Sequence, residues 1–106
     1  MTAPAMRQFV QNYYALIPGD LQTAFAQLGP GLKAQGFDAY RAWWSQFSSV
    51  SITPVAEDPA AGTVTIRLSA VRTANGGVAA DTERLTLIKS PDHAHLLINA
   101  SQVIAG

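Results

Sequence analysis

The stretch that decides the fold runs from Tyr13 to Phe47 and reads YYALIPGDLQTAFAQLGPGLKAQGFDAYRAWWSQF. It holds every aromatic residue of the chain except Phe9. Their spacing of three or four residues is typical of short amphipathic helices, and the breaks at Pro18-Gly19 and Gly29-Pro30-Gly31 separate one helix from the next. The sequence therefore predicts short helices whose apolar faces must pack against another layer.

Three helices are expected, over about residues 5–16, 21–28 and 38–47. Asp20 and Asp38 stand at the start of the second and third helices. A carboxylate at that position accepts hydrogen bonds from backbone amides that have no partner within the helix. We therefore interpret both aspartates as N-caps.

From Ser49 onward the apolar period changes to two residues and β-branched residues become frequent. Turn sequences at 58–62, 75–77 and 91–93 divide this part of the chain into four strands. In the last strand, strict alternation predicts Leu96, Ile98 and Ala100 on one face, with Leu97, Asn99, Ser101 and Val103 on the other. Helices followed by an antiparallel meander predict an α+β fold with the helices on one face of the sheet.

Composition limits the function. With 106 residues, 48% of them hydrophobic, the chain fits a single domain over residues 1–106. Seven basic residues balance seven acidic ones, so we expect no nucleic-acid partner. The chain has no cysteine, which excludes disulfides and thiol catalysis, and its apolar runs are too short to span a bilayer, so we expect no membrane insertion.

No complete catalytic motif is present. Glu83 shares strand parity with Leu85 and Leu87 and could point inward, but we favour a solvated position because glutamate is rarely buried without a partner. His93 and His95 lie at a turn without a third ligand nearby. We therefore expect no catalytic residue, no metal and no cofactor.

The aromatic residues are the remaining candidates for a site. They form either a plain core or the lining of a ligand pocket between helices and sheet. Adjacent Trp43 and Trp44 cannot both face the sheet, because successive helical residues point about 100° apart. The candidate pocket residues, for a small apolar ligand, are Tyr14, Tyr40, Trp43, Trp44 and Phe47.

The outer face of the sheet carries few long charged side chains, and such a face can pair with its copy across a two-fold axis. We therefore expect a homodimer, with a protein partner as the other use of this surface. The candidate dimer-face residues are Arg67, Ser69, Val71, Thr86, Ile88, Leu97, Asn99 and Val103.

The order of elements resembles the cone-shaped fold of the nuclear transport factor 2-like superfamily, which includes ketosteroid isomerase-like and polyketide cyclase (SnoaL)-like proteins. More specifically, segments 13–21, 36–44, 82–88 and 96–101 are similar to a C-terminal extracytoplasmic domain of actinobacterial serine/threonine protein kinases. The resemblance implies three helices on a curved four-stranded antiparallel sheet. It also implies an extracytoplasmic location as part of a membrane kinase, or a cytoplasmic one if the chain is free-standing.

The function implied by this resemblance is a non-catalytic sensor, ligand-binding or protein-interaction module. The alternative is a small enzyme of the isomerase or cyclase type. A buried acid that faces a tyrosine in an open cavity would favour the enzyme. A cavity filled by Trp and Leu side chains would favour the module.

Overall fold

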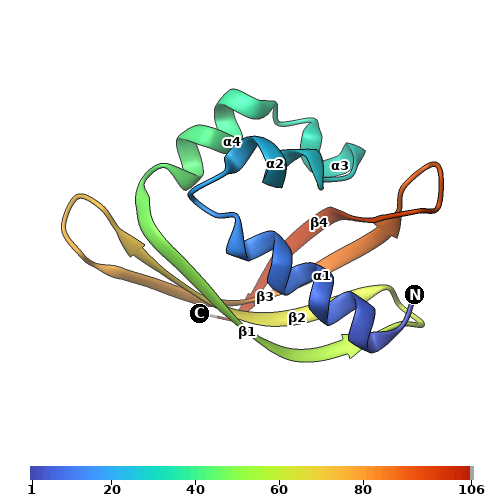
Figure 1. Cartoon of the computed structure of the whole chain (residues 1–106). Coiled ribbons are helices and arrows are strands. Elements are labelled where there is room, and N and C mark those ends of the chain that lie inside the picture. Colours follow the sequence, from blue (N-terminus) through green and yellow to red (C-terminus); the bar gives the residue numbers. More distant parts are fainter. Residues whose placement is uncertain (106) are drawn as a thin grey trace.

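Helices lie on one side of a curved antiparallel sheet in the computed structural model, which describes residues 1–105 (Figure 1). The helices are α1 (Ala3–Ala15), α2 (Leu21–Ala26), α3 (Pro30–Lys33) and α4 (Phe37–Trp44). The strands are β1 (Phe47–Asp58), β2 (Thr63–Arg72), β3 (Val78–Lys89) and β4 (Leu96–Ala105). Each strand pairs with the next, so the order across the sheet is β1-β2-β3-β4.

The expectation of three helices is wrong, because residues 1–105 form four. The segment Gly29-Pro30-Gly31 was expected only to end a helix, but Pro30 also begins α3. Proline suits the first helical position because its φ is already helical and its missing N–H would have no intrahelical acceptor there. This extra turn contributes Leu32 to the lining of a cavity between the helices and the sheet.

The helix starts test the two expected caps. The carboxylate of Asp20 accepts hydrogen bonds from the backbone N–H of Thr23 at 3.2 Å and from its hydroxyl at 2.7 Å, so this cap is confirmed. The cap at Asp38 is wrong: Gly36, with a φ of 86°, precedes α4, and Asp38 lies in the first turn. There its carboxylate is 3.5 Å from the guanidinium of Arg41.

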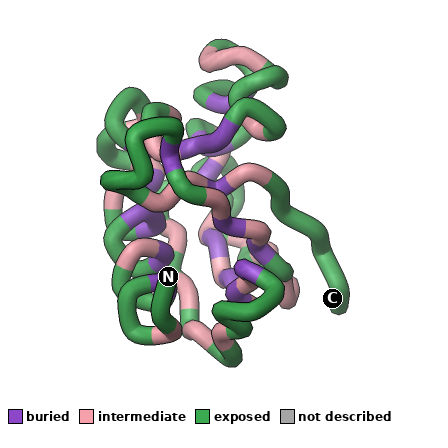
Figure 2. Tube along the Cα trace, turned by 90° about the vertical axis from the view of Figure 1, so that its right-hand side faces the viewer, coloured by how far each residue is buried: buried purple, intermediate pink, exposed green. Residues whose placement is uncertain are grey.

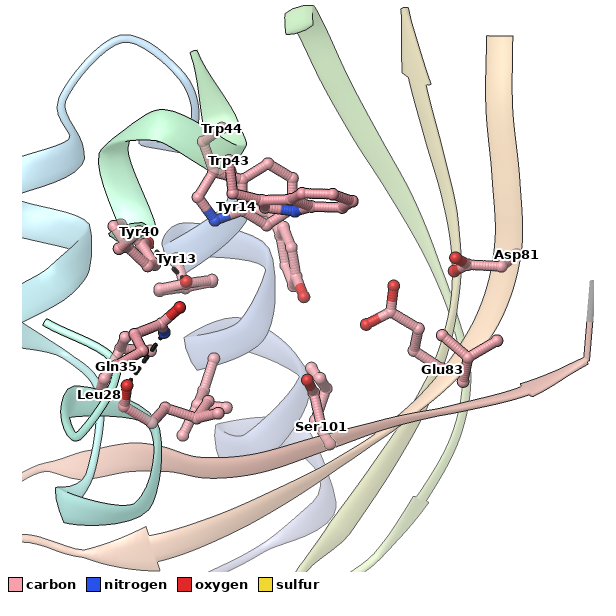
Figure 3. A pocket seen from close by; sticks show the side chains of 14 residues that line it. Tyr13, Tyr14, Leu28, Gln35, Tyr40, Trp43, Trp44, Asp81, Glu83 and Ser101 are labelled. Atoms are coloured by element: carbon pink, nitrogen blue, oxygen red, sulfur yellow. Dashed lines mark hydrogen bonds between the residues drawn. The ribbon is translucent and has the colours of Figure 1, made fainter. Parts of the chain in front are cut away.

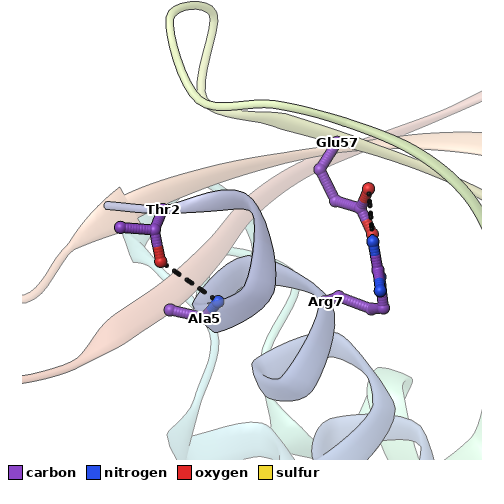
Figure 4. Close-up of polar contacts among 4 residues, drawn as sticks. All are labelled: Thr2, Ala5, Arg7 and Glu57. Carbon is purple, nitrogen blue, oxygen red and sulfur yellow. Dashed lines mark hydrogen bonds and ion pairs between the residues drawn. The ribbon is translucent and has the colours of Figure 1, made fainter.

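Polar contacts fix the first helix at its N-terminal end (Figure 4). The hydroxyl of Thr2 accepts a hydrogen bond from the backbone N–H of Ala5 at 3.3 Å, which caps α1. Arg7 pairs with Glu57 at the far end of β1. Because this ion pair joins residues 50 positions apart in the chain, it ties α1 to the edge strand of the sheet.

The expected turns lie between the strands. Gly76, in the hairpin between β2 and β3, has a φ of 68°, which glycine adopts without steric cost. β3 begins at Val78, five residues before the clearest part of its sequence pattern at Glu83. Pro54 lies in β1, an edge strand, where a missing N–H is tolerated.

A β-bulge in β4 changes which residues face the helices. In the pairing of β3 with β4, Leu87 lies opposite Ile98 but Thr86 lies opposite Ala100, so Asn99 is an extra residue. The strict alternation expected for this strand is therefore wrong. After the bulge, Ser101 and Val103 lie on the helix side together with Ile98.

The core lies between the two layers, where the buried segments of Figure 2 meet. Met6 and Val10 of α1 are fully buried, as are Val64 and Ile66 of β2. α1 lies over β1 and β2, α3 lies over β4, and α4 packs on α2. This arrangement leaves a space between α4 and the inner face of β3 and β4.

The outer edge of β4 is also covered. The backbone N–H of Gly29 donates to the carbonyl of Ile98 at 2.7 Å, and the N–H of Ile98 donates to the carbonyl of Gln27 at 3.0 Å. This short parallel pairing satisfies backbone groups that an open edge would leave exposed. It also holds the segment between α2 and α3 beside the site.

Candidate ligand-binding site

A cavity of about 430 Å³ lies between the helical layer and the inner face of β3 and β4 (Figure 3). This volume falls within the range of about 300 to 1,000 Å³ typical of small-molecule sites. The residues that line it are Tyr13, Tyr14, Leu28, Leu32, Gln35, Tyr40, Trp43, Trp44, Asp81, Glu83, Leu85, Ile98, Ser101 and Val103. The cavity is therefore mostly apolar and aromatic, with a few polar groups.

One wall is aromatic. Trp43 and Trp44 stand side by side on α4, with ring centroids 6.5 Å apart. Trp44 is the inward one, 9% exposed, and its ring and that of Tyr14 pack edge to face with centroids 6.3 Å apart. Trp43 is 56% exposed and stands at the rim. The expectation that only one of the two indoles packs inward is confirmed.

The tyrosine hydroxyls of this wall have two different roles. Those of Tyr13 and Tyr40 form a buried hydrogen bond of 2.6 Å with each other. The hydroxyl of Tyr14 instead points across the cavity toward Glu83 (Figure 3). Burial raises the pKa of Tyr14 well above its ordinary value, and the negative charge of Glu83 adds to this. Tyr14 is therefore a neutral hydrogen-bond donor.

The opposite wall is acidic. Asp81 and Glu83 lie two positions apart on β3, so both side chains point to the helix side of the sheet. The pKa of Glu83 is raised to about 7, first by burial, then by a side-chain hydrogen bond with Asp81 that favours the protonated form, and last by repulsion from the negative charge of Asp81. Near neutral pH, Glu83 is thus divided between its protonated and ionised forms.

Asp81 has an unusual environment. Its Oδ1 atom is buried and has no hydrogen-bond partner among the residues that the structure describes. A buried oxygen without a donor costs about 1 to 3 kcal/mol, and more when it is charged. When Glu83 is protonated, its carboxyl O–H can donate to Asp81; when Glu83 is ionised, the two carboxylates have no such donor and attract a positive charge.

Four of the five expected pocket residues line the cavity: Tyr14, Tyr40, Trp43 and Trp44. Phe47 lies outside it, at the start of β1. Its ring is buried against Trp43 and Trp44, with centroid distances of 5.8 and 6.0 Å. Phe47 therefore supports the aromatic wall from behind.

The solvated position expected for Glu83 is wrong, because its side chain lines the cavity. The sequence did contain the signal: residues 81, 83, 85 and 87 alternate regularly, and Leu85 and Leu87 are core residues. Asp81 follows from the same parity. Ser101 and Val103 could not be found in this way, because the bulge at Asn99 reverses the parity of β4.

The expected dimer-face residues do not form one surface. Val103 lines the cavity, and the side chain of Asn99 accepts a hydrogen bond of 2.8 Å from the backbone of Gly31. Ile88 lies against Gly29, where an added Cβ would come within 3.0 Å of its Cδ1. The five other candidates lie elsewhere on the sheet: Arg67, Ser69, Val71, Thr86 and Leu97.

Two further observations concern metals and membranes. His93 and His95 lie at the turn before β4, and no group of three possible metal ligands exists within residues 1–105. None of the helices in this part of the chain has the length and apolarity that crossing a membrane requires.

Comparison with known proteins concerns the fold. No protein-family model matches this chain, and no curated protein matches it in sequence. A solution structure of a SEC-C motif containing protein from Rhodopseudomonas palustris is similar, with a TM-score of 0.52 and 14% identity. The match covers 95% of this chain and 90% of that one.

This likeness shows the fold alone, because the identity is low. It also corrects the sequence-based expectation of a nuclear transport factor 2-like cone: the solved structure that matches is that of a SEC-C motif protein, and residues 1–105 form four helices instead of three. What the comparison supports is an α+β fold in which helices cover a four-stranded antiparallel sheet.

Proposed function

We propose that this chain is a small-molecule-binding module. The observation that carries the proposal is the cavity of about 430 Å³, whose aromatic wall faces the carboxyl groups of Asp81 and Glu83. Ligand sites combine apolar walls with a small number of convergent polar groups in this way. The apolar lining supplies affinity, and the tyrosine hydroxyl and the carboxyl groups orient the ligand.

Binding can be tested with a library of small apolar molecules that each carry one polar group. We expect changes in the ¹H–¹⁵N NMR spectrum of residues that line the cavity, above all the indole N–H of Trp43. Ser101→Phe, which places a ring in the cavity, should abolish these changes. Ser49→Phe, at an exposed position on β1 outside the cavity, is the matched control. If no molecule shifts the cavity residues, the proposed function is wrong.

A second candidate function is a proton-transfer enzyme. The specific observation in its favour is that Glu83, with a pKa of about 7, faces the neutral hydroxyl of Tyr14. An ionised Glu83 would take a proton from the carbon next to a carbonyl group, and the C–H electron pair would move into the enolate. Tyr14 would then donate a hydrogen bond to the enolate oxygen, and return of the proton would regenerate the carboxylate.

This alternative is distinguished from simple binding by exchange in D₂O. An enzyme would exchange the α-protons of a small phenyl-substituted ketone such as phenylacetone faster than buffer does, and Glu83→Gln or Tyr14→Phe would remove the acceleration. If the wild-type protein binds the ketone without accelerating exchange, the chain is a binding module only.

The sequence resemblance adds a proposal about context. Attachment to a bacterial membrane serine/threonine kinase would make the module a sensor whose ligand reaches it outside the cytoplasm. The gene that encodes the chain tests this proposal directly, because the same reading frame would have to encode a kinase domain and a membrane span.

A further inference from the structure

The charges around the cavity all have one sign. Its ionisable groups are Asp81 and Glu83 on β3, Tyr13 and Tyr14 on α1, and Tyr40 on α4. No lysine, arginine or histidine lines it in the part of the chain that the structure describes. A ligand therefore meets only negative or neutral groups.

The buried oxygen of Asp81 gives this negative lining a consequence for the charge of the ligand. Oδ1 has no hydrogen-bond partner within residues 1–105, and the hydroxyl of Tyr14, which points across the cavity, is directed toward Glu83. With Glu83 ionised, a neutral apolar ligand would leave the Asp81 oxygen unpaired in a still drier environment, which is costly. A ligand that brings a positive charge would satisfy it.

The aromatic wall has the same preference. The faces of Trp and Tyr rings carry negative electrostatic potential and attract ammonium groups within about 6 Å, which is how aromatic cages bind alkylated ammonium ions. Trp43, Trp44 and Tyr14 present their rings on the side opposite the two carboxyl groups (Figure 3). Trp43 is half exposed at the rim, where a bound ligand would cover it.

We propose that the cavity binds an organic cation, a substituted ammonium group carried on an apolar body. The inference rests on the proposed binding function and specifies its ligand. The ammonium group lies between the carboxyl groups of Asp81 and Glu83 and the rings of α4. The apolar body packs on Leu28, Leu85 and Ile98, which line the rest of the cavity. A bare metal ion fits less well, because it would find two carboxylates but no third ligand.

The proposal predicts a pH dependence with a definite sign. A quaternary ammonium probe does not titrate, so any change in affinity comes from the protein. Glu83 loses its proton as the pH rises through about 7, which adds a negative charge to the wall. The groups that face it are Asp81 on the same strand and the tyrosines of α1 and α4, whose pKa values are raised and which stay neutral over this range. Affinity should therefore increase from pH 6 to pH 8.

The test uses benzyltrimethylammonium, the neutral 3-phenyl-1-propanol and the anion 3-phenylpropionate at constant ionic strength. Affinities come from calorimetry and tryptophan fluorescence, and NMR shifts locate each probe. At pH 8 we expect the cation to bind at least about tenfold more tightly than the alcohol, with the anion weakest. Between pH 8 and pH 6 the affinity for the cation should fall by about three- to tenfold.

The variants Asp81→Asn and Glu83→Gln keep the shape of the side chains and remove one charge each. Each should weaken binding of the cation by about tenfold at pH 8 and leave the alcohol unaffected. Asp38→Asn is the matched control, because it removes one negative charge from a carboxyl that is 94% exposed and outside the cavity.

The outcomes separate the two proposals. If the alcohol binds in the cavity as tightly as the cation, the ligand is not a cation but the binding function stands. If binding of the cation persists unchanged in both carboxyl variants, or is independent of pH, the cation proposal is likewise wrong. If no probe shifts the cavity residues, both proposals fail.

Discussion

The pKa of Glu83 reflects the burial and the neighbouring charge of its carboxyl group. Glu83 has a pKa of about 7 because it is half-buried and next to Asp81. The ionised form is thus less stable in the folded protein than in the unfolded chain, where the ordinary pKa of glutamate applies. Since the folded-state pKa is raised, the contribution of this group to stability is greatest below the unfolded pKa and declines as the pH rises toward 7.

The variant Glu83→Gln tests this linkage. Relative to the wild type, it should gain about 1 to 2 kcal/mol in free energy of unfolding between pH 4 and pH 8, a figure reduced from the full shift because solvent screens a half-exposed group. Urea unfolding of both proteins across this range measures the difference. A difference that is the same at pH 4 and pH 8 would mean that Glu83 has an ordinary pKa.

The two tryptophans differ in burial, and therefore in how much each side chain stabilises the fold. Trp44 is 9% exposed and contacts Tyr14 and Phe47, so Trp44→Ala should cost about 3 to 5 kcal/mol in free energy of unfolding. Trp43 is 56% exposed, and Trp43→Ala should cost about 1 kcal/mol. Chemical denaturation of the two variants provides the comparison. Equal losses would contradict the orientation of α4.

At the scale of elements, the contact between α3 and β4 depends on glycine. A Cβ added to Gly31 would lie 2.5 Å from the backbone oxygen of Asn99, closer than any real contact allows. The same glycine donates its N–H to the side chain of Asn99 at 2.8 Å. The bulged residue Asn99 of β4 and the first turn of α3 are therefore held together by close backbone packing and a hydrogen bond.

Gly31→Ala should consequently destabilise the protein by about 2 kcal/mol, because backbone atoms would have to move. Gly19→Ala is the matched control: the nearest atom to its added Cβ is the carbonyl oxygen of Leu16 at 4.0 Å. This second change should be neutral or stabilise by up to about 1 kcal/mol through the unfolded state. Thermal unfolding distinguishes them, and similar melting temperatures for the two variants would contradict the close contact.

The elements also show what can be predicted from the sequence. The hairpin at Asn75-Gly76-Gly77, the cap at Asp20 and the inward parity of Leu85 and Leu87 follow from local rules of turn geometry, capping and period. The four-residue helix α3 does not, since it is too short to show a periodic pattern.

Part of the candidate site could likewise be predicted from the sequence, and part could not. Its aromatic wall could be predicted because helical spacing places Tyr40, Trp43 and Trp44 close together. Its β4 wall depends on the bulge at Asn99, whose side chain accepts a hydrogen bond from Gly31 of α3, a tertiary contact that local patterns do not contain. The inward position of Glu83 was available from parity, but the usual exposure of glutamate argued against it.

At the scale of the whole molecule, the helices within residues 1–105 leave the outer face of the sheet uncovered (Figure 1). Self-association through that face stays a prediction, now without Ile88, Asn99 and Val103, which contact the chain's own segments or line the cavity. Sedimentation at about 100 μM should show a dimer, since weak two-fold interfaces form in that range. Arg67→Glu should change the stability of this dimer. A monomer at this concentration would contradict self-association through the outer face.

The layers also explain why the cavity exists. α1 and α3 lie directly on the sheet, whereas α4 packs on α2 and faces the acidic part of β3 across a gap. This gap brings a half-buried acid, Glu83, opposite an aromatic wall. An exposed acid on a solvated strand would have no such environment.

The most direct test is an NMR titration of the Glu83 side-chain carboxyl carbon in the ligand-free protein. We expect a midpoint near pH 7. In Asp81→Asn, the loss of the neighbouring carboxylate should move that midpoint to lower pH. A midpoint near 4.5, the ordinary value for glutamate, in both the wild type and the variant would contradict the half-buried acidic wall and the site built on it.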